Sequence, residues 1–303
     1  MTYPADQEQT VFYNPVQVQN RDLSILMISL YGERRRKRMH LREYRKKLRT
    51  EEKLLDKPLN ERLAEYEATL DATELVRSEN TAEEGLTILD ALAASGLRSI
   101  RYWKEIPGVK HVTINDLDPA AVERAHANLA VNNLTDVLLK DTDDDRGHGI
   151  RIQCGDATHE MYLSRRAPNL HTKMPPQFLQ KDQFDIIDLD PYGSAAPFVD
   201  AAVQAVRDGG MLCVTCTDMA ALGGSHPETA YGRYGSMPIQ RAKYLQEFAL
   251  RILLHTLAVS AARYGRTIRP ILSVGMAFYV RVFVEVNNDK AGVSTLDHGN
   301  SGS

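Results

Sequence analysis

From residue 86 onward, short apolar runs alternate with segments whose apolar residues have helical spacing. Seven runs have the length of strands, at residues 86–90, 111–115, 150–154, 184–190, 211–217, 271–274 and 278–286. Helical segments start at Leu97 and cover residues 119–131, 198–206 and about 240–263. This alternation is typical of an α/β fold in which helices cover both faces of a parallel sheet. We therefore predict a doubly wound, mainly parallel seven-stranded sheet over residues 86–286.

The first 85 residues do not follow this pattern. Residues 1–32 predict a leader in which Asp22 or Ser24 caps a short apolar helix that runs through Leu30. Residues 33–85 are highly charged, with apolar residues at helical spacing after Pro58, and predict an inserted helical arm outside the core. The polar stretch at 140–149 predicts a loop, and the small polar residues at 287–303 predict a disordered tail.

Charge is distributed unevenly along the chain. Residues 33–49 hold ten Lys or Arg and two acids, a balance of +8, so the rest of the chain carries −3 − 8 = −11. A basic stripe in an acidic chain is typical of a phosphate-binding surface. A solvated basic helix and a nuclear-import signal are the alternatives, and phosphate contact is slightly favoured over both.

The composition excludes several classes of protein. No apolar run approaches the ~18 residues of a transmembrane helix, and the N-terminus has no secretory signal pattern. The three cysteines cannot form a disulfide framework, which indicates a reducing compartment. Cys213 and Cys216 have metal-site spacing, but on a strand they point to opposite faces, so no metal site is predicted. An intracellular protein is expected, with the nucleus favoured and the mitochondrion as the alternative.

The clearest chemical feature is Asp190-Pro191-Tyr192-Gly193, directly after the fourth apolar run. In open α/β sheets, ligands bind just beyond the carboxyl ends of parallel strands. Here Asp190 can accept hydrogen bonds from an amine on a flat ring, and Tyr192 can stack on that ring. The loop resembles the Asp/Asn-Pro-Pro-Tyr/Phe loop of methyltransferases that modify amino groups of nucleobases.

Three other predicted strands also end in acidic residues. Asp90 precedes a turn with a single glycine, Gly96, which suits S-adenosylmethionine better than a dinucleotide with a bulky pyrophosphate. Asp116 is placed to bind ribose hydroxyls, and Asp156 with the backbone of Ala157 is placed to bind an adenine ring. Each acid alone could be a helix cap, but four at successive strand ends favour one shared cofactor site.

Several longer motifs resemble those of the tRNA (guanine-26-N2)-dimethyltransferase family. The most specific are Asp90-Ala-Leu-Ala-Ala-Ser-Gly-Leu-Arg98 and Asp188-Leu-Asp-Pro-Tyr-Gly-Ser194. Others lie at residues 12–17, 20–24, 115–116, 215–220, 251–254, 262–265 and 278–283. The resemblance covers almost all of residues 11–286 outside the two insertions.

The resemblance implies a class I methyltransferase fold and transfer of one or two methyl groups from S-adenosylmethionine to guanine N2 in tRNA. It implies that Asp190 is the catalytic carboxylate and that the leader contributes to the active site. The implied roles are the methionine end of the cofactor for Arg21 and Arg98, ribose for Asp116, adenine for Asp156 and Ala157, and stacking on guanine for Phe12 and Tyr192.

Family members usually continue into a C-terminal domain that helps to hold tRNA. This chain ends soon after Val286, so we expect that domain to be absent, and we expect cofactor binding rather than efficient tRNA methylation to survive its absence. Two alternatives to the enzyme stay open. An RNA-binding protein that lost turnover is disfavoured by the intact Asp190 and Arg21, and an amino methyltransferase acting on DNA or protein is disfavoured by the family-specific leader.

Overall fold

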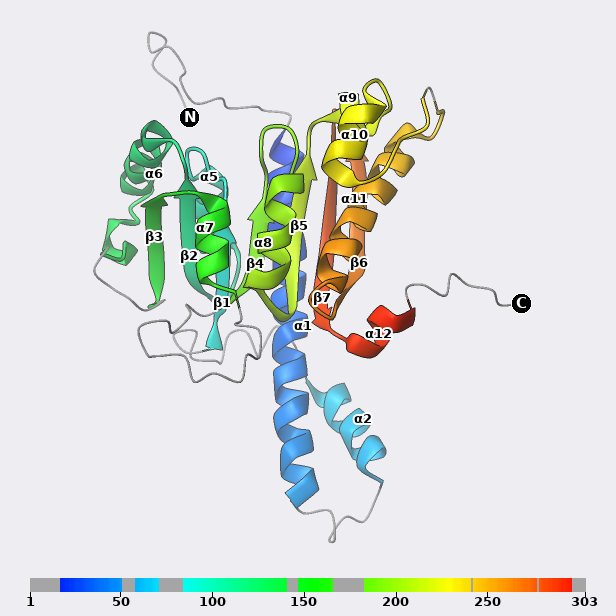
Figure 1. The fold of residues 1–303 in the computed structure, drawn as a ribbon. Coiled ribbons are helices and arrows are strands. Elements are labelled where there is room, and N and C mark those ends of the chain that lie inside the picture. Colours follow the sequence, from blue (N-terminus) through cyan, green and yellow to red (C-terminus); the bar gives the residue numbers. More distant parts are fainter. Residues whose placement is uncertain are drawn as a thin grey trace, which may run out of the picture.

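The computed structural model describes residues 17–50, 58–70, 84–140, 147–165, 183–240, 242–276 and 278–295. Within these residues the strands are β1 (Leu86–Asp90), β2 (Val109–Asp116), β3 (Gly149–Cys154), β4 (Phe184–Leu189), β5 (Val206–Cys216), β6 (Arg266–Met276) and β7 (Tyr279–Asn288). They form one seven-stranded sheet in the order β3-β2-β1-β4-β5-β7-β6 (Figure 1).

The direction of the strands is mainly parallel. β1 to β5 are parallel to one another, whereas β7 runs antiparallel to β5 and to β6. The predicted doubly wound, mainly parallel sheet is therefore confirmed. Because β1 to β4 are parallel, their carboxyl ends meet at one edge of the sheet, where the acidic residues of the sequence lie.

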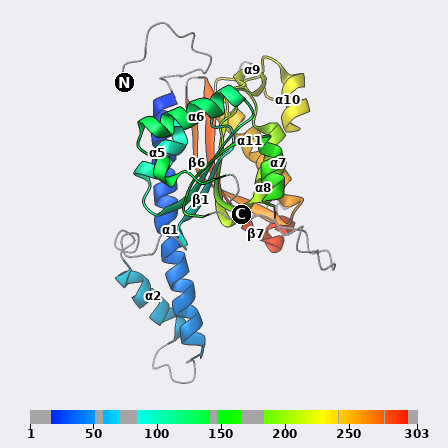
Figure 2. The same ribbon diagram turned by 90° about the vertical axis from the view of Figure 1, so that its left-hand side faces the viewer.

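Helices cover both faces of the sheet (Figures 1 and 2). On one face, α5 (Leu97–Glu105), α6 (Pro119–Val131) and the first half of α1 (Val18–Thr50) join a core cluster with Ile88 and Cys213. On the other, α7 (Ala157–Leu163), α8 (Ala196–Ala205) and α11 (Leu245–Ala262) join a cluster with Val214 and Cys216. The two cysteines thus face opposite sides of β5, as their spacing predicts.

The start of α6 shows why the local sequence specifies its boundary. The Asp118 side chain accepts a hydrogen bond from the Ala120 amide at 3.0 Å, and Pro119 occupies the first helical position. Asp118 thus satisfies one of the backbone N–H groups that a helix leaves unpaired at its start, and Pro119 has no N–H group to satisfy. The helix spans the predicted residues, Pro119–Val131.

α1 corrects two expectations about the N-terminal region. It is one helix from Val18 to Thr50, so no break in secondary structure separates the leader from the arm at residues 32–33. Asp22 and Ser24 lie inside this helix, so the prediction that one of them caps its start is wrong. The Ser24 hydroxyl instead donates to the Asn20 carbonyl oxygen one turn earlier, at 2.8 Å.

Part of the basic stripe holds α1 to the sheet. Arg35 forms an ion pair with Asp185 at 3.1 Å, and Arg38 forms one with Glu285 at 2.7 Å. Arg36 is only 2% exposed and donates to the Gly108 carbonyl oxygen. The expectation that the arm lies outside the core is therefore wrong for this first part of the stripe.

The second half of α1 extends beyond the sheet with α2 (Leu59–Thr69) alongside it (Figures 1 and 2). Stacking of Tyr44 on Tyr66, with ring centroids 4.1 Å apart, joins the two helices, and Leu48 and Leu63 are buried. Arg42, Arg45, Lys46 and Arg49 are exposed on this projecting part.

The remaining helices are short: η3 (Thr135–Val137), α9 (Met219–Leu222), α10 (Pro227–Tyr234) and α12 (Lys290–Thr295). β7 continues to Asn288 and α12 follows it, so the expected disordered tail is wrong for residues 287–295, while residues 296–303 lie outside the described part. Residues 141–146 of the predicted loop at 140–149 also lie outside the described part of the chain. No helix among the described residues is long and apolar enough to cross a membrane.

Candidate active site

A cavity of about 800 Å³ opens at the carboxyl ends of β1, β2 and β4. Five of the residues predicted from the sequence line it together: Arg21, Arg98, Asp116, Asp190 and Tyr192. This volume lies within the usual range for small-molecule sites. The structure therefore brings the ends of three strands and the N-terminal helix α1 into one site.

The turn between β1 and α5 forms one wall of the cavity. Gly96 has a φ of 69°, a left-handed conformation that side chains rarely adopt, and an added Cβ would lie 3.1 Å from the Ala125 side chain. The Asp116 carboxylate fixes the turn from the next strand, because it accepts the Ala94 amide at 2.7 Å. It also accepts the Asp118 amide at 3.0 Å, after the end of its own strand.

The predicted adenine-binding pair does not line this cavity. The Asp156 carboxylate caps α7 by accepting the amides of Thr158 at 2.6 Å and His159 at 3.1 Å, and Ala157 is buried. These contacts are those of a helix cap, the alternative role of each strand-end acid. An adenine contact for Asp156 and Ala157 stays a prediction. Phe12, for which the family resemblance implies stacking on guanine, lies outside the described residues.

The loop after β4 is held in place from behind while its aromatic ring faces outward. The Gly193 amide donates to the Thr217 hydroxyl, and the Thr217 amide donates to the Gly193 carbonyl oxygen, both at 2.8 Å. Ser194 and Tyr234 are joined through their hydroxyls at 2.6 Å. Tyr192 is 94% exposed and lines the cavity, a position from which an aromatic ring can stack on a flat ligand.

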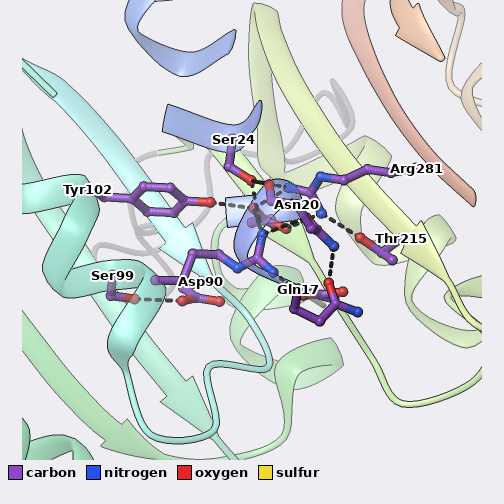
Figure 3. A network of polar contacts seen from close by, with 11 residues as sticks. Gln17, Asn20, Ser24, Asp90, Ser99, Tyr102, Thr215 and Arg281 are labelled. Carbon is purple, nitrogen blue, oxygen red and sulfur yellow. Dashed lines mark hydrogen bonds and ion pairs between the residues drawn. The ribbon is translucent and has the colours of Figure 1, made fainter. Parts of the chain in front are cut away.

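Asp190 is paired with Arg98, which is itself almost buried. Arg98 Nη2 donates to the Asp190 carboxylate, whereas Nη1 donates to Asn20 Oδ1 at 3.1 Å and to Ser24 Oγ at 2.9 Å (Figure 3). Only 7% of Arg98 is exposed. The guanidinium thus connects α1 to the carboxylate at the end of β4.

A second, fully buried ion pair adjoins the first, because Asp188 Oδ2 lies 3.5 Å from Arg98 Nη1. Arg281 on β7 binds both carboxylate oxygens of Asp188, at 3.2 and 2.7 Å, and both residues are 0% exposed. Arg281 also donates to Thr215 and to Ser24, and Tyr102 donates to Asp188. Every one of these contacts joins elements that are far apart in the sequence.

Asp90, at the end of β1, is the third carboxyl group in this cluster. Burial raises the pKa of Asp90 to about 7, and the Asp188 carboxylate adds to the rise, while Arg98 and a hydrogen bond from Ser99 oppose it. Three carboxyl groups face two guanidinium groups, so protonation of Asp90 leaves the cluster neutral. Among the described residues, no three His, Cys, Asp or Glu side chains gather as metal ligands.

The chain that carries this cavity, with the Asp-Pro-Tyr-Gly loop on its rim, matches a family model over nearly its whole length. The model, described as N2,N2-dimethylguanosine tRNA methyltransferase, covers residues 2–298. The chain belongs to this family. The family resemblance drawn from the motifs is thereby confirmed.

Several relatives are similar over nearly the whole chain. A tRNA (guanine(26)-N(2))-dimethyltransferase of Schizosaccharomyces pombe is 40% identical over 93% of this chain and 47% of its own length. The mouse protein of the same name is 39% identical over 97% of this chain and 41% of its own. The chain thus spans less than half the length of these relatives.

A solved structure supports the same family assignment. The complex of Trm1 from Pyrococcus horikoshii with S-adenosyl-L-methionine has a TM-score of 0.66 and 26% identity to this chain. The alignment covers 97% of this chain and 60% of that one.

Some residues of the site were not predicted from the sequence. Phe278, 38% exposed, and Thr217 line the cavity, and Tyr234 supports its rim. Phe278 and Thr217 lie within the family motifs, and that is the signal that could have identified them.

Proposed function

We propose that this chain binds S-adenosylmethionine and methylates the exocyclic N2 of guanine 26 in tRNA, with one or two methyl groups transferred. The observation that supports this most directly is the cavity where Asp190 and the exposed Tyr192 meet Arg98, Arg21 and Asp116. Family membership supports the choice of donor and of substrate. The donor, the substrate and the methyl transfer are all proposed for this chain, because the chain spans less than half the length of the relatives that carry the name of this activity.

The residues present fit the donor. The turn with a single glycine, Gly96, and the Asp116 carboxylate suit a nucleoside without a pyrophosphate, and Arg21 and Arg98 suit a carboxylate. When bound, S-adenosylmethionine supplies an electrophilic methyl group on a positively charged sulfonium. Arg98 would hold the methionine end, and Asp116 would hold the ribose.

Guanine N2 is a poor nucleophile because its lone pair is delocalised into the ring. The Asp190 carboxylate accepts a hydrogen bond from the N2 amine, which raises electron density on the nitrogen. As the N2–CH3 bond forms and the S–CH3 bond breaks, Asp190 takes the proton that leaves N2. Tyr192 stacks on the base, which must leave the RNA helix to reach the cavity.

Incubation of the protein with labelled S-adenosylmethionine and total tRNA, followed by mass spectrometry of the nucleosides, tests the proposal. We expect N2-methylguanosine and N2,N2-dimethylguanosine, and no label in a tRNA in which guanine 26 is replaced by adenine. Binding of tRNA without any product would favour the RNA-binding alternative. Label in DNA or protein alone would favour an amino methyltransferase that acts on DNA or protein.

We further propose that the protein acts inside the cell, where tRNA is present. A relative from Saccharomyces cerevisiae, 36% identical over 95% of this chain, is named as mitochondrial. The nucleus remains the favoured compartment because of the basic stripe in α1.

Replacement of Asp116 by alanine should weaken binding of S-adenosylmethionine. The variant loses a charged acceptor for the ribose hydroxyls, and we expect a loss on the order of 2–4 kcal/mol, measured by calorimetric titration. Asp118→Ala is the matched control, because Asp118 caps α6 two residues away and does not line the cavity. Equal affinities for the Asp116 variant and the wild type would remove Asp116 from the cofactor site.

We also propose that the projecting part of α1 binds tRNA phosphates. Four of its exposed cations are Arg42, Arg45, Lys46 and Arg49, whereas Arg35 and Arg38 are committed to ion pairs with the core. Replacement of the four by glutamine should weaken tRNA binding and reduce the slope of its salt dependence by up to about one unit per lost contact. Binding of S-adenosylmethionine should not change.

The matched control replaces four exposed cations of the body of the protein: Lys104, Arg251, Arg263 and Lys290. Titration of labelled tRNA at four or more salt concentrations gives the slopes. If the α1 variant and the wild type show the same slope, the stripe is a solvated helix or an import signal.

A further inference from the structure

We infer that Ser24 and Asn20 of α1 are positioning residues for Asp190 and act on it through Arg98. This inference rests on the proposed function, in which Asp190 takes the proton from guanine N2. It assigns to the N-terminal helix a part in the chemical step, beyond any contact that the helix makes with the cofactor.

The geometry starts from the two ends of one guanidinium group. Arg98 Nη2 donates to the Asp190 carboxylate, and Nη1 donates to Asn20 Oδ1 at 3.1 Å and Ser24 Oγ at 2.9 Å (Figure 3). Asn20 and Ser24 are four residues apart, so they lie on the same face of α1. Both are 0% exposed, so water does not replace either acceptor.

The hydroxyl of Ser24 has no bonding capacity left. A hydroxyl offers one donor and two acceptor sites. Ser24 donates to the Asn20 carbonyl oxygen at 2.8 Å, and accepts from Arg98 at 2.9 Å and from Arg281 at 2.8 Å. This one side chain therefore holds both guanidinium groups of the cluster at fixed positions.

Loss of these acceptors would leave Arg98 between two carboxylates. Asp188 Oδ2 already lies 3.5 Å from Nη1 of Arg98, and Asp188 is fully buried. Without Ser24, we expect Nη1 to turn toward Asp188, which draws Nη2 away from Asp190. A catalytic carboxylate that loses its orienting partner loses alignment with the proton that it must accept.

The test compares Ser24→Ala and Ser24→Thr with the wild type. Ser29→Ala is the matched control on the same helix, since Ser29 lies outside the cluster. Turnover is measured with both substrates at saturation, alongside KM for tRNA, affinity for S-adenosylmethionine and the melting temperature. We expect kcat of Ser24→Ala to fall at least about tenfold with little change in KM for tRNA. Ser24→Thr, which restores a hydroxyl, should recover most of kcat.

A role limited to packing of α1 predicts a different result. In that case the melting temperature of Ser24→Ala falls, while kcat of the folded protein stays at the wild-type value. That outcome overturns the inference, and so does a kcat loss that Ser24→Thr fails to restore. A change confined to cofactor affinity also overturns it, because Arg98 would then serve only the methionine end.

Asn20→Ala is the second variant, for use if Ser24→Ala does not fold. It removes one acceptor from Arg98 and leaves the contact of Ser24 with Arg281 in place. The same fall in kcat is expected, and an unchanged kcat contradicts the inference. Absence of turnover in the wild type contradicts the proposed function, and with it this inference, whereas equal turnover in wild type and variants contradicts the inference alone.

Discussion

Asp190→Asn is expected to abolish methyl transfer while binding of S-adenosylmethionine stays close to that of the wild type. The amide has the shape of the carboxylate but cannot take the proton from guanine N2, and its NH2 group would face the amine of the base. Loss of a general base typically reduces the rate about 10²- to 10⁴-fold. Single-turnover transfer of labelled methyl groups to tRNA measures the loss.

Asp136→Asn is the control for this experiment, because Asp136 is an exposed carboxylate on η3 and does not line the cavity. Its rate should match the wild type. The two variants should also unfold at similar temperatures. Activity of Asp190→Asn within a few-fold of the wild type, with matched folding, would leave Asp190 as a loop carboxylate that pairs with Arg98.

Most of the fold could be predicted because the strands and helices of the core have local patterns. The sequence predicts α6 to the residue, since Asp118 and Pro119 specify its start and apolar spacing specifies its length. The charge pattern predicts a boundary at residues 32–33, and that prediction is wrong because α1 runs unbroken from Val18 to Thr50. A helix can continue through a charged segment when its cations find partners, as Arg35 does with Asp185.

The candidate site was predictable where a residue lies at the end of a strand. Asp116 and Asp190 line the cavity for that reason. The partners of those residues could not be predicted, because they come from distant elements. Ser24 and Arg281 are 257 positions apart in the chain and share a hydrogen bond, and no local pattern encodes that pairing.

Asp188 shows the same limit of local patterns. It lies inside the apolar run of β4, where its spacing indicates only a buried strand residue. Burial alone would raise the pKa of Asp188, but Arg281 and Arg98 outweigh that effect and hold the pKa below its ordinary value. Stability from this carboxylate is therefore present above its pKa in the unfolded chain and is lost as pH falls through the lower pKa of the folded state.

Arg281→Met is expected to reduce the free energy of unfolding by about 3–5 kcal/mol at neutral pH. The variant leaves the Asp188 carboxylate buried without the guanidinium that binds both of its oxygens. Its pKa should rise in the variant, so that the carboxyl group takes up a proton as pH falls. The difference in stability between wild type and variant should therefore be largest at neutral pH and should shrink toward acid pH.

Urea unfolding at several pH values measures this difference. Arg269→Met is the matched control, because Arg269 lies on the neighbouring strand β6, is half-exposed and pairs with Glu285 at 2.6 Å. Its loss should stay below about 1 kcal/mol. The double variant Arg281→Met/Asp188→Leu should recover part of the stability, since it removes the unpaired charge together with its partner. Equal losses for Arg281→Met and Arg269→Met at neutral pH would mean that the fully buried guanidinium contributes no more than the half-exposed one.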